Sequence, residues 1–231
     1  MRRSATRLKL LVVSDVGGRI ERVNQLCEAV VCSTDCDADA VLVSGGFVAP
    51  RGPHAFEALE AVGCAEGDMT ALVSRLEMII CRVIYIPDDV RLVFRVWSHD
   101  PPTTRSTVVA PPSLTQYSSN VYCKAEQLVP GVMVMGEAYY FKLLNDGKNP
   151  VEGQDLVLVL RDSASEFDSD GSRYLEIIGG GNHDPHLETP LLFPGSLREG
   201  QYAVLELEKL PTDGSWVVRS AKFQQLPPLD Q

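Results

Sequence analysis

Two histidines and an aspartate follow a short apolar run in the last quarter of the sequence. Residues 174–183 read YLEIIGGGNH, and the next three residues are Asp184, Pro185 and His186. Imidazole and carboxylate groups are ligands that zinc uses in proteins. His183 and His186 would need a helix to share one face, and Pro185 breaks it. The stretch therefore indicates either part of a metal site or the remains of one.

The composition is that of an ordinary globular protein without a membrane-spanning segment. The chain has 231 residues, of which 45% are hydrophobic, and a formal net charge of -10. No apolar run approaches the roughly 20 residues that cross a bilayer, so we expect no membrane insertion. The dispersed negative charge argues against direct contact with nucleic acid. We expect protein partners instead.

The cysteine pattern and the first residues of the sequence predict a reducing intracellular compartment. Six cysteines occur without a CxxC pair, which is typical of free thiols in a reducing environment. The start lacks the apolar core of a signal peptide, and residues 1–7 are predicted to be a basic tail. We therefore expect a cytoplasmic protein, with a ciliary or mitochondrial assembly as the alternative.

The first half of the sequence alternates buried strands with helices. Residues 8–15, LKLLVVSD, and 38–46, ADAVLVSGG, are apolar runs of strand length, typical of strands covered on both faces. Between them, residues 19–32 carry apolar side chains at helical spacing. Ligands of such strand-helix-strand units bind at the carboxyl ends of the strands. Asp15 and Gly45 to Gly46 are therefore expected at a potential site.

The second half is dominated by strand-like runs. After a predicted helix around Met69 to Met78 and a strand within 81–89, such runs are separated by Pro, Gly, Asn and Asp turns. This pattern predicts an α/β fold of two sheets packed face to face with helices mainly outside, in one domain over residues 1–231. Residues 163–172 are expected to form an exposed loop, and 224–231 a C-terminal tail. The strand-like runs are 91–97, 106–112, 120–128, 131–141, 155–162, 173–180, 201–210 and 215–223.

The order of the strand ends resembles the calcineurin-like metallophosphoesterase family. That family marks successive strand ends by D-x-H, G-D, G-N-H-D or G-N-H-E, a lone histidine and G-H-x-H, and several members continue with N-P-G-S and a strand. This sequence has, in the same order, LLVVSDVGG, VLVSGGF, VIYIPDDVR, LVLVLRDS, GGNH and FPGSLREGQYAVLELE. The resemblance spans nearly the whole chain. It implies an αββα sandwich of two mixed β-sheets flanked by helices, whose loops hold two metal ions.

Most of the family's metal ligands are replaced in this sequence. Asp15 matches the first aspartate, but Gly17 stands for the following histidine and Gly46 for the metal-bridging aspartate. Asp89 replaces the asparagine ligand, and Val90 the histidine that would assist the leaving group. Two cations held about 3.5 to 4 Å apart need a shared ligand, and a glycine has no side chain to share. The resemblance therefore implies that the dinuclear site is absent.

The two later motifs are also incomplete. Arg161 and Asp162 occupy the neighbourhood of the lone histidine, Gly181 replaces the first histidine of the last motif, and His183 matches the second. We expect Asp15 to be held without metal by backbone N–H groups or by an arginine, either Arg91 or Arg161. No cofactor is expected. The alternative is one divalent metal, zinc or manganese, bound by Asp15, Asp89 and His183. His186 is the other candidate for the third ligand, in place of Asp89.

The sequence supports three functional hypotheses. The first is an inactive metallophosphoesterase-like protein that serves as a protein-binding or scaffold subunit of a larger intracellular assembly, as some members of the fold do. The second is a divergent phosphoesterase that hydrolyses phosphate esters with a single metal site. The third is a small-ligand or nucleotide binder without catalysis. Ser196 lacks the G-x-S-x-G context of a nucleophile and is assigned to a turn.

A candidate interface lies in residues 131–141, GVMVMGEAYYF. If this segment is a strand, some of its large apolar side chains point away from the core, and an exposed methionine and aromatic patch would bind a partner. Core packing accounts for most of them. The candidate residues are Met133, Met135, Tyr139, Tyr140 and Phe141.

Overall fold

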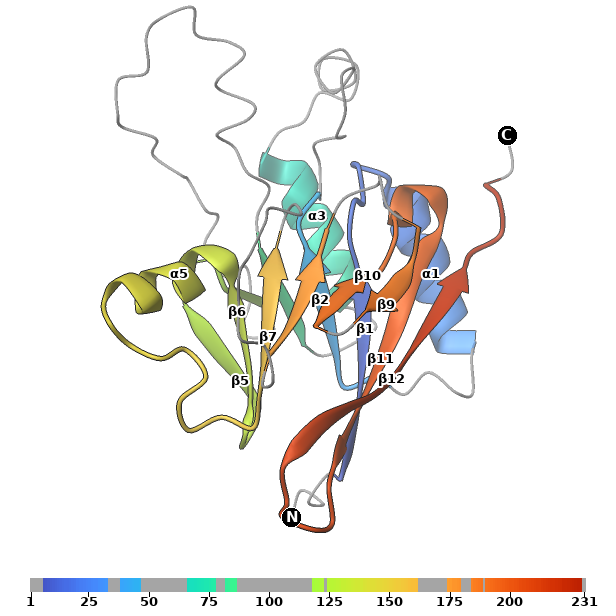
Figure 1. Cartoon of the computed structure of the whole chain (residues 1–231). Helices are drawn as coiled ribbons and strands as arrows, with labels where there is room; N and C mark the ends of the chain where they lie inside the picture. Colours follow the sequence, from blue (N-terminus) through green and yellow to red (C-terminus); the bar gives the residue numbers. More distant parts are fainter. Residues whose placement is uncertain are drawn as a thin grey trace, which may run out of the picture.

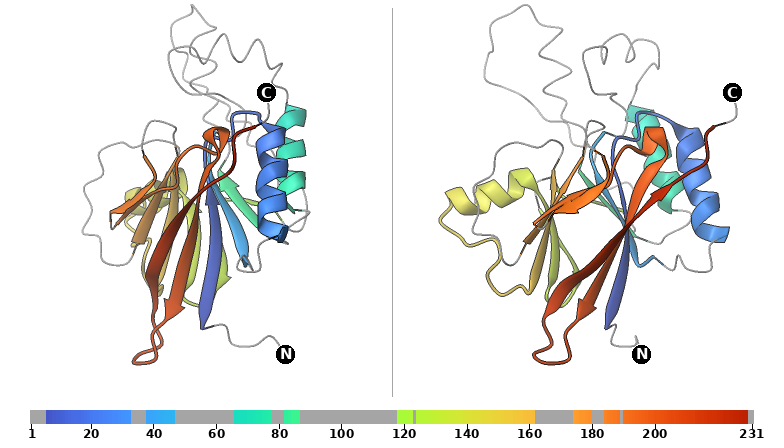
Figure 2. Two further views of the ribbon diagram at one scale, coloured as in Figure 1. Left: turned by 90° about the vertical axis from the view of Figure 1, so that its right-hand side faces the viewer. Right: turned by 45° about the vertical axis from the view of Figure 1, so that its right-hand side comes forward.

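Two six-stranded sheets pack face to face in the computed structural model, with helices on their outer sides (Figure 1). The left view of Figure 2 shows the two sheets and the helices beside them. This arrangement confirms the predicted α/β sandwich of two mixed sheets. The structure describes residues 6–32, 38–46, 66–77, 82–86, 118–122, 124–161, 174–179, 184–188 and 190–229.

The first sheet contains the predicted strand-helix-strand unit. Its strand order is β12-β11-β1-β2-β3-β4, in which β1 to β4 are parallel and β11 is antiparallel to both of its neighbours, β1 and β12. Helix α1 connects β1 to β2, and α3 precedes β3. The bounds are β1 (Arg7–Val13), α1 (Ile20–Cys32), β2 (Ala40–Ser44), α3 (Glu66–Glu77), β3 (Val83–Ile86), β4 (Ser118–Asn120), β11 (Gln201–Lys209) and β12 (Trp216–Gln225).

The second sheet has the order β5-β6-β7-β8-β10-β9. Strands β6, β7, β8 and β10 are parallel, and the outermost strands β5 and β9 are antiparallel to their neighbours. The bounds are β5 (Ala125–Val129), β6 (Val132–Gly136), α5 (Glu137–Asn145), β7 (Leu156–Arg161), β8 (Tyr174–Ile178), β9 (His186–Glu188), β10 (Leu191–Phe193) and the short 3₁₀ helix η1 (Leu197–Glu199).

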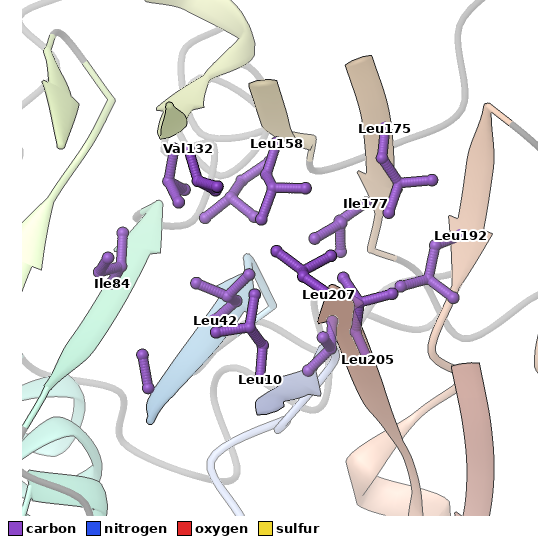
Figure 3. Packing of buried hydrophobic residues seen from close by; sticks show 14 of the residues in the cluster. Leu10, Leu42, Ile84, Val132, Leu158, Leu175, Ile177, Leu192, Leu205 and Leu207 are labelled. Atoms are coloured by element: carbon purple, nitrogen blue, oxygen red, sulfur yellow. The ribbon is translucent and has the colours of Figure 1, made fainter. Parts of the chain in front are cut away.

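The main core lies between the two sheets. Alternate residues of each strand point to opposite faces, so Leu10 of β1 faces the second sheet while Leu11 faces α1 and α3. Figure 3 shows Leu10 and Leu42 from the first sheet beside Leu158 and Ile177 from the second. Because the central strands are covered on both faces, their sequences are continuously apolar, as the sequence predicted.

Residues 131–141 do not form one strand, so this part of the prediction was wrong. Strand β6 ends at Gly136 and helix α5 begins at Glu137. A Cβ atom on Gly136 would lie 2.8 Å from the carbonyl oxygen of Val121 and 3.0 Å from Cγ2 of Ile86. The glycine thus permits close backbone contact where the chain leaves the sheet. The aromatic residues 139–141 belong to the helix.

The bounds predicted for the two tails overlap described parts of the fold. Arg7 is the first residue of β1, and its Nε donates a hydrogen bond to Glu208. At the other end β12 continues to Gln225, and the buried Leu226 donates its backbone N–H to Gly200. Residues 91–97, 106–112 and 163–172 lie outside the described ranges, and the assignment of 1–231 to one domain remains a prediction.

Two buried titratable groups between the first sheet and its helices should make the fold sensitive to alkali. Burial raises the pKa of the Cys27 thiol from 9.0 to about 11 and that of the Tyr85 phenol from 10.0 to about 12. Between pH 9 and 12 the unfolded chain releases protons that the folded chain retains, so stability falls as pH rises, by up to about 1.4 kcal/mol per pH unit for each group. Urea denaturation at several pH values measures this loss. Tyr85→Phe should reduce this loss of stability above pH 10. An unchanged pH dependence in the variant would contradict a raised pKa of Tyr85.

Candidate functional site

The candidate site lies where strand ends of the two sheets meet. A Cβ atom added to Gly179, directly after β8, would overlap the carbonyl oxygen of Ser44 at the end of β2. Gly179 also donates its backbone N–H to the carbonyl oxygen of Arg161, the last residue of β7, at 2.8 Å. The carboxyl ends of β2, β7 and β8 are therefore close neighbours, as expected for the ligand-binding edge of parallel strands.

A tight turn after β1 places Asp15 at this edge. Asp15 has φ of 47°, and Gly17 and Gly18 have φ of 60° and 70°. Left-handed backbone is uncommon for residues other than glycine, although aspartate and asparagine adopt it more readily than most. Asp15 is only 1% exposed. The turn between β1 and helix α1 therefore buries a carboxylate.

The turn after β2 packs directly against the Asp15 turn. The backbone N–H of Asp15 donates to Gly45 O at 3.2 Å, and that of Gly17 donates to Gly46 O at 2.9 Å. Gly46 has φ of 70°, and a Cβ atom there would lie 2.7 Å from Cα and 2.9 Å from N of Asp15. Such contacts involve backbone, which cannot rotate away. Position 46 therefore has no room for a side chain in this arrangement.

Ser196 holds the Asp15 carboxylate. Its Oγ donates a hydrogen bond to Asp15 Oδ2 at 2.7 Å, and Ser196 is as buried as Asp15. Among the described residues, this partner is neither a backbone N–H group nor Arg161, whereas Arg91 lies outside the described ranges. Further bonds join the same segments: Ser14 Oγ to Gly195 O at 2.6 Å, Leu197 N to Ser14 O at 2.9 Å and Arg198 N to Asp15 O at 3.0 Å.

The Arg161 side chain points away from the site and does not pair with the remnant of it, contrary to the prediction. Leu160 faces the core between the sheets, so Arg161, the next residue on β7, points to the outer face of the second sheet. There its guanidinium group forms ion pairs with Glu176 of β8 and, at 3.0 Å, with Glu137 at the start of α5. Arg161 therefore links β7, β8 and α5.

Gly17 and His186 have identifiable surroundings. The aliphatic part of Arg198 covers Gly17, since a Cβ atom on Gly17 would lie 3.0 Å from Arg198 Cδ. The His186 ring stacks on Phe193 with ring centres 4.4 Å apart, and its Nδ1 lies 2.7 Å from Asp184 O. Both residues are thus packed against neighbouring side chains of the fold.

The described residues provide few metal ligands. Within the ranges that the structure covers, no group of three histidine, cysteine, aspartate or glutamate side chains is arranged to hold a metal ion. Asp15 Oδ1 has no hydrogen-bond partner among these residues. The mononuclear alternative depends on side chains outside the described ranges and remains a prediction. The predicted positions outside them are Asp89, Val90, Arg91, Asp162, Gly181 and His183.

Comparison with known proteins gives matches in structure but none in sequence. No protein-family model matches the chain, and no curated protein matches it. The protein TT1561 of Thermus thermophilus superimposes with a TM-score of 0.51 at 16% identity, over 87% of this chain and 94% of that protein. This chain shares the fold of TT1561. At this identity the likeness concerns the fold alone.

Two other solved structures are similar at lower scores. The calcineurin-like phosphoesterase YfkN from Bacillus subtilis gives a TM-score of 0.47 at 13% identity, over 96% of this chain and 90% of that one. Vacuolar Protein Sorting 29 from Cryptosporidium parvum gives 0.38 at 12% identity, over 96% of this chain and 100% of that one.

The predicted interface residues differ widely in exposure. Met135 and Tyr140 are buried against the outer face of the second sheet, and Met133 and Tyr139 are partly buried there. Phe141 is 36% exposed, and Leu144, which the sequence reasoning missed, is 43% exposed. Residues three apart on a helix are neighbours, so correct recognition of the helix would have paired Phe141 with Leu144.

No helix in the described part of the chain is long and apolar enough to cross a membrane.

Proposed function

We propose that the protein is a catalytically inactive relative of the calcineurin-like metallophosphoesterases that serves as a protein-binding or scaffold subunit of a larger intracellular assembly. The ordered motifs in the sequence and the two-sheet fold support the relationship. The observation that carries the proposal is the contact between the two turns after β1 and β2. Gly46 there lies against the backbone of Asp15, where catalysis with two metals would require a bridging carboxylate.

The exposed side of α5 is the proposed binding surface for a protein partner. Phe141 and Leu144 are the large hydrophobic residues that remain exposed among the described residues. They lie on the outer side of the helix, whose Tyr140 packs against the second sheet. Large apolar side chains that are buried on binding commonly supply most of the affinity of an interface. An apolar surface on a partner subunit would complement this pair.

Replacing this pair should weaken the association with a partner without unfolding the protein. We expect Phe141→Ser combined with Leu144→Ser to reduce affinity at least about tenfold, which corresponds to about 1.4 kcal/mol. Affinity purification from the native cell followed by quantitative mass spectrometry measures recovery of a stoichiometric companion. Lys142→Ser, an exposed change on the same helix, is the matched control and should retain the companion.

Two results would count against this proposal in different ways. Recovery of the wild-type protein as a monomer, without a stoichiometric companion, would contradict the subunit role. Equal recovery of the companion with the double variant would place the interface elsewhere on the chain. Thermal denaturation of each variant verifies that the fold is intact before binding is compared.

A divergent phosphoesterase with one metal ion is the second candidate. It is favoured by Asp15 Oδ1, a buried carboxylate oxygen without a hydrogen-bond partner in the described residues. Metal analysis of the purified protein and hydrolysis of an aryl phosphate and a phosphodiester with added manganese separate the two proposals. Activity lost in both Asp15→Ala and His183→Ala would support the enzyme. Activity indifferent to both changes would indicate a contaminant.

A further inference from the structure

We infer that the turns after β1 and β2 form a closed, metal-independent clasp with the segment before β11, and that restoring the missing aspartate would not create a dinuclear site. The clasp consists of residues 14–18, 45–46 and 195–198. It joins the end of the first strand to a segment far along the chain. The inference concerns these turns alone and stands whether or not α5 binds a partner.

Position 46 has no space for a bridging carboxylate. A carboxylate that bridges two cations must project from the backbone into the gap between them. At Gly46 the first side-chain atom would already lie 2.7 Å from Cα of Asp15, and the backbone φ of 70° disfavours any residue with a Cβ. An aspartate at this position therefore requires the two turns to separate.

Backbone hydrogen bonds keep the two turns together. Separation would break two backbone hydrogen bonds, from Asp15 N to Gly45 O and from Gly17 N to Gly46 O. Both turns lie at the buried edge of the first sheet, where lost backbone hydrogen bonds are expensive. The turns are therefore held in contact by the backbone itself, independently of any ion.

The Asp15 carboxylate has a hydrogen-bond partner in the clasp. The Ser196 hydroxyl donates to Asp15 Oδ2 at 2.7 Å, and both residues are 1% exposed. A metal ion has ordinary ligand distances of about 2.0 to 2.2 Å to carboxylate oxygen, so an ion at Oδ2 would compete with this bond. Ser196 therefore supplies a hydrogen-bond donor at the oxygen that such an ion would otherwise bind. Asparagine at position 15 would still accept the bond and tolerates positive φ.

Restoring the two family residues that are missing from the clasp tests the inference directly. The variant Gly17→His with Gly46→Asp is dialysed against manganese or zinc, and its metal content and urea midpoint are measured. We expect no metal above the wild-type level and a lowered midpoint that metal does not raise. Gly147→Asp is the control, because Gly147 has φ of 71° but open space around its Cβ. Gly147→Asp should lower the urea midpoint less than the double variant does. Two bound metal ions together with a metal-raised midpoint would overturn the inference.

Single changes in the clasp keep the test decisive if the double variant does not fold. Ser196→Ala should lower the urea midpoint, and so should Asp15→Ala. For each variant, the decrease should be the same in chelator as in manganese. Asp15→Asn should retain most of the wild-type midpoint in both conditions. If manganese raises the urea midpoint of the wild-type protein but not that of Asp15→Asn, Asp15 is a metal ligand. That result would contradict the metal-independent clasp.

Discussion

Replacing Gly46 with alanine is expected to lower the free energy of unfolding by about 3 kcal/mol or more. The left-handed backbone accounts for about 1 to 2 kcal/mol of this loss. The rest arises from the contact of the new Cβ with Cα and N of Asp15, at 2.7 and 2.9 Å. Overpacking in a close-packed region typically costs about 1 to 3 kcal/mol, and here the opposing atoms are backbone and cannot change rotamer. The whole Asp15 turn must shift.

Gly147→Ala separates the steric part of this effect from the backbone part. Gly147 has nearly the same φ, 71°, but nothing lies within 4 Å of its added Cβ. We expect a loss of only about 1 to 2 kcal/mol there, the cost of the left-handed conformation. Urea denaturation of the two variants measures the difference. Equal losses would mean that the turns after β1 and β2 separate easily, which would weaken the argument against a restored metal site.

The strands and their layers could be predicted largely from the sequence because burial on both faces leaves a clear signal. Residues 8–15 and 38–46 are continuous apolar runs of strand length, and they form β1 and β2 as expected. Residues 131–141 carry the same apolar density, but their second part packs one helix face against the second sheet. Apolar content alone does not distinguish a buried strand from such a short helix. Gly136 at the junction was the available signal.

The site was only partly predictable because its contacts join distant segments. The loss of the bridging aspartate at Gly46 followed from the resemblance, but the packing of Gly46 on Asp15 did not. The partner of Asp15, Ser196, is 181 residues away along the chain, and no local pattern records such a contact. The direction of Arg161 was missed for another reason. Alternation is hidden in a strand whose two faces are both apolar.

Breaking the buried ion pair between Arg161 and Glu176 should have an effect of similar size. Arg161→Met leaves Glu176, which is 2% exposed, without its cationic partner and removes the ion pair to Glu137. Loss of one member of a buried pair typically costs about 3 to 5 kcal/mol, because the remaining charge stays desolvated. We expect a loss of this size in urea denaturation. Lys222→Met, which removes an exposed ion pair with Glu206, should cost less than about 1 kcal/mol.

The double variant Arg161→Met with Glu176→Leu tests the cause of this loss. If the uncompensated charge is responsible, removing Glu176 as well should recover much of the stability, since apolar replacements of buried pairs are often neutral or stabilising. The two single effects would then be strongly non-additive. Purely additive losses would instead mean that each side chain stabilises the fold by separate packing. Glu137 would remain in the double variant, and its partly exposed carboxylate can regain water, so it should not prevent the recovery.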